Sequence, residues 1–240
     1  MKQDDYIKLT NSEDFISTLE EVEVLLSAAE SLDKNKRTEY AAFNKSALLL
    51  LAGKFENFAE SIAEDYVDCI NQLKPCHSLI SNKLKLEHTF KMLANFDDYK
   101  HKHKHTNAIK TFAELGEFWA SSSNYICLNI DCKFSYGKHG EAELNKLLST
   151  IGIDNILDKI SVIRYKESIL DNEDSATEAD FKGTFNSVNG IRNNILHENA
   201  SPSLTTEMVH NYKEEFQIFA RELEKYLNNE LLQISSACAR

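Results

Sequence analysis

The sequence has few of the residues that form tight turns, with only 7 Gly and 2 Pro among 240 residues. A protein of many short strands needs more turn formers, so this scarcity favours helices. No apolar run approaches the length of about 18 residues that a membrane span needs, and the first fifteen residues lack the apolar core of a signal peptide. The five Cys are an odd number without close spacing, which indicates reduced thiols in a cytoplasmic protein.

The chain is acidic, with a formal net charge of −11 at pH 7 and a pI near 5.2. An acidic surface repels phosphate, so the average charge argues against a nucleic-acid partner. The charge is unevenly distributed, however. Residues 74–110 hold 8 Lys, 5 of the 8 His and only 3 acids, whereas residues 171–180 hold five acids and no base. The basic segment keeps RNA or DNA binding open, and the acidic one is expected to be a solvated loop.

Apolar residues recur at helical spacing over most of the chain, so we expect an all-α fold. The spacing predicts helices over residues 15–32, 40–73, 82–96, 111–121, 141–151, 154–165, 179–197 and 207–232. Residues 125–134 have strand-like composition but also fit an irregular insert. Because no linker is rich in Gly, Ser or Pro, residues 1–240 are predicted to form one helical domain with an irregular central insert.

The segment 179–197 has two different faces when it is drawn as a helix. The apolar face carries Phe181, Phe185, Val188, Ile191 and Ile195, and the other face carries Asn186, Asn189, Asn193 and His197. Three amides and an imidazole make a poor core stripe unless each is hydrogen-bonded. Arg192 lies at the border of the two faces, so its stem can pack while its guanidinium reaches the polar side.

This polar face carries groups suited to cleaving a phosphodiester without a metal. His197 can move protons near neutral pH, and Arg192 can stabilise negative charge on a phosphate in the transition state. A helix end without catalysis has the same pattern: His197 then favours the negative C-terminus, and Arg192 pairs with an acid such as Glu198. Spacing alone leaves both interpretations open.

The residues from Arg192 to His197 read RNNILH, an Arg and a His separated by four positions near the end of a helix. This motif resembles that of the HEPN superfamily, in particular the RiboL-PSP and MAE-like endoribonucleases. Residues 49–58 (LLLAGKFENF) and 147–153 (LLSTIGI) resemble helices of the same families, in the same order. The resemblance covers roughly residues 12–232 and is loose in the middle third.

The resemblance implies an HEPN-like helical bundle and a metal-independent endoribonuclease of toxin or phage-defence type, with no cofactor. Two subunits would form a composite site, at which a ribose 2′-OH attacks the adjacent phosphate and leaves a 2′,3′-cyclic phosphate. Carried onto this chain, His197 transfers protons, Arg192 binds phosphate and Asn193 orients them, with Asn194 in a supporting place. The implied partners are RNA, a second copy of the chain, and an antitoxin or neighbouring defence protein.

A second conspicuous run alternates basic residues, namely Lys100, His101, Lys102, His103, Lys104 and His105. In an extended chain the three His share one face and the three Lys the other. The run fits a solvated loop, and it also fits RNA contact through Lys and His. A transition-metal site is the third alternative, but no acid or Cys with ligand spacing completes one, so no metal is predicted.

Several other residues have a structural and a functional interpretation. Glu56, within a predicted helix, is a candidate to support Arg192 or His197, although an exposed Glu beside Lys54 fits equally. Cys127 and Cys132 are too far apart for a redox motif and are interpreted as structural thiols. Trp119 and the aromatic residues at helical spacing are interpreted as core residues rather than stacking platforms.

The main alternative function is a non-catalytic helical scaffold or protein-interaction module. HEPN-like domains also serve as binding units, and the apolar residues 48–52 would then contact a protein partner. Absence of RNA cleavage together with tight co-purification of another protein would favour this alternative.

Overall fold

The computed structural model describes residues 9, 12–33, 35–94, 96, 104–120, 129–132, 134, 136, 140–160, 163–166, 175–197 and 203–238. The fold is all-α, as predicted, apart from one short antiparallel strand pair. The elements are α1 (Ser12–Thr18), α2 (Glu20–Glu30), α3 (Arg37–Leu73), the 3-10 turn η1 (His77–Leu79), α4 (Asn82–Leu93), α6 (His105–Ala120), α7 (Glu141–Thr150), α8 (Ile156–Lys159), β1 (Ile163–Lys166), β2 (Ser175–Glu178), α9 (Phe181–His197) and α10 (Thr206–Cys238).

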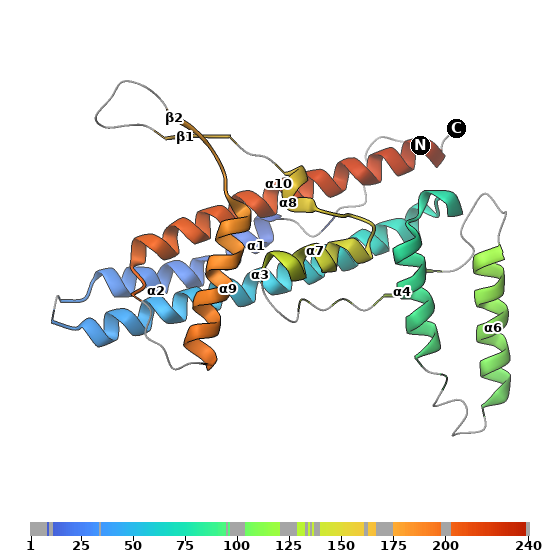
Figure 1. Cartoon of the computed structure of the whole chain (residues 1–240), viewed down its shortest axis with the longest axis horizontal. Helices are drawn as coiled ribbons and strands as arrows, with labels where there is room; N and C mark the ends of the chain where they lie inside the picture. Colours follow the sequence, from blue (N-terminus) through green and yellow to red (C-terminus); the bar gives the residue numbers. More distant parts are fainter. Residues whose placement is uncertain are drawn as a thin grey trace.

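Two long helices form the axis of the molecule. α3 has 37 residues, a length of about 55 Å at 1.5 Å per residue, and α10 packs along it (Figure 1). α1 and α2 pack against both, while α9 crosses the pair steeply near one end of the bundle (Figure 1). The buried apolar faces of these helices form one continuous core.

Phe55 of α3 lies at the centre of this core and is 2% exposed. Its ring centroid is 4.6 Å from that of Phe216 on α10 and 4.9 Å from that of Phe185 on α9. Further rings surround it at 6.0 to 6.2 Å, those of Phe15, Phe219, Phe58 and Tyr136. The Phe55 ring on α3 therefore contacts α9 and α10 at the same time. These contacts position the N-terminal half of α9 in the bundle.

The N-terminal helix differs from its prediction because it divides at Leu19 into α1 and α2. Ser17 and Thr18 donate side-chain hydrogen bonds to the carbonyls of Asp14 and Phe15, three residues back. Such bonds compete with the next helical turn. The apolar stripe nevertheless continues through the break, because Leu19 itself is buried.

The region after α7 departs further from the prediction. The break at Gly152 is confirmed, with a positive φ of 92°, but the helix predicted over 154–165 is wrong beyond the four residues of α8. Ile163–Lys166 instead pairs as β1 with β2, and β2 occupies part of the predicted acidic loop 171–180. A β-branched and aromatic sequence at 160–165 suits a strand once a partner segment is present.

The middle of the chain forms a helical arm and an irregular insert. α4 and α6 lie side by side at the end of the molecule away from α9 (Figure 1), and α6 is longer than the predicted helix 111–121. Residues 129–132 have no regular structure, so the irregular insert is confirmed there. Asn71 holds this segment by accepting from the Ile130 N–H at 2.6 Å and donating to its carbonyl at 2.8 Å.

Within the described part of the chain, none of the helices combines the length and apolar character needed to cross a membrane.

Candidate functional site

The N-terminal half of α9 is anchored in the bundle. The Asp180 carboxylate accepts a hydrogen bond from the Gly183 N–H at 2.8 Å, which caps the helix start. Phe181, Phe185 and Val188 are buried, and Phe185 stacks on Phe216 of α10 with ring centroids 5.0 Å apart. The apolar face predicted for this segment therefore does face the core.

The C-terminal half of α9 emerges from the bundle. Ile191 and Ile195, on the same face as the buried residues, are only half-buried. Leu196 is 48% exposed, and His197 is exposed at the last position of the helix. The segment that carries the RNNILH motif thus lies at an open end of the helix rather than in the core.

The amides on the polar face of α9 form a relay toward Arg192. Asn193 donates from Nδ2 to Oδ1 of Asn189 at 3.3 Å, and its own Oδ1 accepts from Nη1 of Arg192 at 3.4 Å. Because each amide is held by its neighbour, the guanidinium of Arg192 is directed toward the polar side of the helix. Asn193 therefore contacts the Arg192 guanidinium, and its role as an orienting residue stays a prediction.

Asn186, the first amide of the stripe, joins α9 to α7. Its Oδ1 accepts from the Glu141 N–H, and its Nδ2 donates to the Glu141 carboxylate, both at 3.3 Å. Lys182 also pairs with Glu141 at 2.6 Å. These contacts satisfy an amide donor at the start of α7 and fix the rotation of α9. Residue spacing does not indicate them.

Gly140, just before α7, allows Asn189 to pack closely. Its φ of 115° is in the region that favours glycine, and a Cβ there would lie 3.1 Å from Nδ2 of Asn189. The Tyr136 hydroxyl donates to the Gly140 carbonyl at 3.2 Å. Tyr136 and Gly140 therefore support the relay from the insert, a contribution that residue spacing does not reveal.

Glu56 of α3 lies close to the relay. It is half-buried, and burial and the neighbouring Glu60 carboxylate raise its pKa, while the positive charge of Arg192 lowers it. The exposed Glu beside Lys54 is the wrong interpretation, since Lys54 pairs with Glu21 at 3.1 Å. Glu56 thus belongs to the electrostatic surroundings of Arg192, and its supporting role stays a prediction.

The remaining motif residues are placed less closely together. Asn194 is half-buried, and the His197 side chain makes no hydrogen bond or ion pair within the described residues. The alternative pairing of Arg192 with Glu198 falls outside those residues. The structure therefore brings together Arg192, Asn193 and Glu56, and leaves His197 open at the helix end.

The described part of the basic run, Lys104 and His105, lies far from this site. Both residues are exposed, and His105 begins α6, so the chain is helical rather than extended at that residue. Lys100, His101, Lys102 and His103 lie outside the described residues. Since α6 lies at one end of the molecule, away from α9 (Figure 1), a single chain does not bring Lys104 and His105 to Arg192 and His197.

Two of the described cysteines, Cys69 and Cys132, are unsuited to catalysis. Burial raises the pKa of both Cys69 and Cys132 to about 12, so their thiolate forms are scarce at neutral pH. This agrees with the structural interpretation of Cys132, whereas Cys127 lies outside the described residues. No group of three His, Cys, Asp or Glu able to hold a metal ion occurs in the part of the chain that the structure describes.

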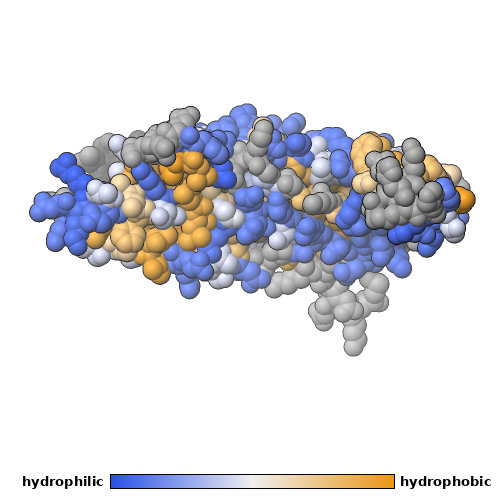
Figure 2. All heavy atoms as spheres, turned by 90° about the horizontal axis from the view of Figure 1, so that it is seen from below, coloured by the Kyte–Doolittle hydropathy of each residue, from blue (hydrophilic) through white to orange (hydrophobic). Residues whose placement is uncertain are grey.

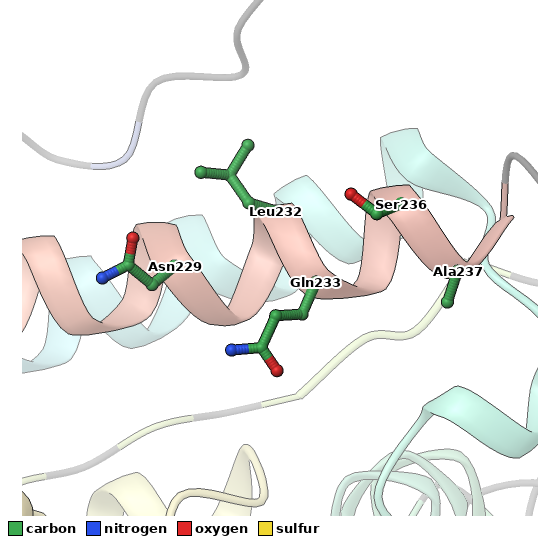
Figure 3. A pocket seen from close by; sticks show the side chains of 5 residues that line it. All are labelled: Asn229, Leu232, Gln233, Ser236 and Ala237. Atoms are coloured by element: carbon green, nitrogen blue, oxygen red, sulfur yellow. The ribbon is translucent and has the colours of Figure 1, made fainter.

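A hollow of about 560 Å³ lies along the end of α10. Figure 3 shows the five side chains that line it, all from the last turns of this helix: Asn229, Leu232, Gln233, Ser236 and Ala237. None of the five titrates, so these residues supply no acid or base. The open end of α9 remains the stronger candidate site.

Comparison with known protein families gives one match. The family model described as RiboL-PSP-HEPN matches residues 13–229, a range that includes α3, α9 and most of α10. Searches of the curated proteins and of the solved structures give no match.

Proposed function

Since the chain belongs to the RiboL-PSP-HEPN family, we propose that it is an endoribonuclease that cleaves RNA without a metal ion. The observation that carries this proposal is the open end of α9. There an amide relay orients Arg192, and His197 is exposed at the last position of the same helix. A fixed cation and a free imidazole on one exposed helix end suit a phosphodiester substrate.

In the proposed reaction the ribose 2′-oxygen attacks the adjacent phosphorus and the bond from phosphorus to the 5′-oxygen breaks. A neutral His197 imidazole removes the 2′-OH proton, and a protonated imidazole delivers a proton to the departing 5′-oxygen. Arg192 stabilises the charge on the phosphate oxygens in the transition state. The products are a 2′,3′-cyclic phosphate and a 5′-hydroxyl end.

This reaction needs one neutral and one protonated imidazole, which two copies of His197 in a homodimer would supply. The exposed Leu196 and the half-buried Ile191 and Ile195 give the end of α9 an apolar surface that a second copy can cover. Figure 2 shows hydrophobic surface in the left half of the view, the half in which Figure 1 places α9, and also at the right-hand end. Covering the end of α9 would also exclude water around Arg192, which strengthens its interaction with phosphate.

The biological setting that we propose is a cytoplasmic toxin or phage-defence nuclease, restrained by an antitoxin or a neighbouring defence protein. The net charge of −11 limits unspecific capture of nucleic acid, so RNA binding should be local and salt-sensitive.

The test is cleavage of labelled tRNA and mRNA in EDTA, with analysis of the product ends. Wild-type protein should produce 2′,3′-cyclic phosphate and 5′-hydroxyl ends. His197→Ala and Arg192→Ala should each lower the rate by about 100-fold or more, since a general acid–base or a charge-stabilising group contributes at least that much.

His210→Ala is the matched control. His210 is another partly exposed imidazole, but it lies on α10 beside Glu23 and Glu30. It should cleave at the wild-type rate. Unchanged cleavage by His197→Ala would refute the proposal, and a complete lack of cleavage with tight co-purification of another protein would favour the scaffold alternative.

A further inference from the structure

An exposed strip runs along one flank of α6, beside the buried side of the helix. It consists of Ile109 (69% exposed), Phe112 (60%) and Trp119 (40%), with His105 at its start. The buried side of the same helix is formed by Thr111, Leu115 and Phe118. The interpretation of Trp119 as a core residue is therefore wrong: its neighbour Phe118 takes the core position, and the indole lies at the surface.

The Trp119 ring is held in place despite its exposure. Its Nε1 donates to the Thr89 hydroxyl of α4 at 2.9 Å, and that hydroxyl donates to the Lys85 carbonyl at 2.8 Å. The polar edge of the indole is thus satisfied by protein while much of the ring is open to solvent. Beside Thr89 in the sequence, Phe90 is also exposed, at 58%. A pre-positioned, solvent-facing ring loses little entropy when a flat ligand stacks on it.

The charge around the strip is favourable to an anion. At 100° per residue, the two acids of α6, Glu114 and Glu117, lie on the opposite side of the helix from the strip. The strip starts at the exposed pair Lys104 and His105, at the positive N-terminus of the helix. Among the described residues of α6, no acid lies on the strip itself. In a chain with a net charge of −11, an aromatic strip of this kind next to basic residues is complementary to a polyanion with aromatic groups.

We propose that this α6 strip binds single-stranded RNA by stacking bases on Trp119 and Phe112. The two rings are seven residues apart on one helix face, about 10 Å along its axis, so separate bases of one strand can reach both. Unpaired bases expose the π-faces that such platforms need, whereas bases inside a duplex do not. The inference rests on the proposed function and deepens it, because it names single-stranded RNA as the substrate class and a holding site away from α9 (Figure 1).

Trp119 is the single Trp of the chain, so its fluorescence reports on the strip directly. The full-length protein is titrated with 2′-O-methyl oligouridylate and oligoadenylate, which lack the attacking hydroxyl and are not cleaved. Stacking should quench the emission in a saturable manner, and the same adenylate annealed to its complement should quench far less.

Phe112→Ala keeps the reporter and removes the second platform. Because Phe112 is mostly exposed, the fold should be retained, which circular dichroism checks. The apparent dissociation constant should rise roughly 5- to 100-fold, the loss expected for one base–aromatic stack. Glu117→Gln, on the opposite side of α6, is the matched control and should bind the single strands like wild type or slightly more tightly.

Three outcomes would overturn the inference: no quenching by either single strand, equal affinity in Phe112→Ala, or equal quenching by the duplex. A change in Trp119 emission with protein concentration alone would assign the strip to a second copy of the chain instead. Cleavage that depends on His197 but occurs without quenching would reject the α6 strip and leave the proposed function intact. Quenching without any cleavage would support the α6 strip and reject the proposed function.

Discussion

Replacing Phe55 by Ala tests the core that positions α9. The ring is 2% exposed and lies within 5 Å, between centroids, of both Phe185 and Phe216. Truncating a buried Phe costs about 3–5 kcal/mol, and each close aromatic pair adds about 0.5–1.5 kcal/mol beyond burial. With two such pairs, we expect the upper part of the range, a loss of about 4–5 kcal/mol in the free energy of unfolding.

Equilibrium unfolding in urea measures this loss. With a slope of about 2–3 kcal/mol per molar, the midpoint should fall by roughly 1.3–2.5 M. Phe90→Ala is the matched control, since Phe90 is 58% exposed on the arm, and a surface truncation of this kind changes stability by about 0.5 kcal/mol or less. A loss below about 2 kcal/mol for Phe55→Ala, or equal losses for both variants, would refute the central place of Phe55.

Three further predictions concern a helix cap, two buried thiols and a buried histidine. Asp180→Ala should lose about 1 kcal/mol of stability because the Gly183 N–H loses its acceptor, while Asp180→Asn keeps most of it; equal thermal shifts in the two variants would contradict the cap. Burial raises the pKa of Cys69 and Cys132 to about 12, so iodoacetamide near neutral pH should label them only after unfolding, and peptide mapping that finds Cys69 modified in the folded protein would disprove this. Burial lowers the pKa of His88 below its ordinary 6.5, so the unfolded chain takes up this proton first and stability should fall as the pH drops below about 6.5. His88→Gln should weaken that dependence in urea unfolding at about pH 7.5 and about pH 5.5, and an unchanged dependence would show that His88 does not contribute.

The helices that the sequence predicted best are those with one long apolar face. α3, α9 and α10 repeat apolar residues at helical spacing because one side of each packs into the core. The same spacing correctly separated the buried face of α9 from its polar stripe. Within α9, however, burial decreases from Phe185 to Leu196. The spacing of apolar residues does not predict where a helix leaves the bundle.

The parts that the sequence did not predict depend on contacts between distant segments. Asn186 and Glu141 are 45 residues apart, and nothing local to either residue indicates that one caps the other's helix. β1 forms because residues 175–178 are available to pair with it, so its local sequence was compatible with a helix as well. Trp119 was assigned to the core on spacing, but the adjacent Phe118 occupies that position beside His77 and His88.

The central claim is that cleavage requires two copies of the α9 end in one site. The most direct measurement is RNA-cleaving activity per chain across a dilution series, with the dimer fraction determined by sedimentation at the same concentrations. The account predicts that activity and dimer fraction fall together, and that His197→Ala is inactive even when it is fully dimeric. A monomer that retains the full activity per chain would contradict the composite site.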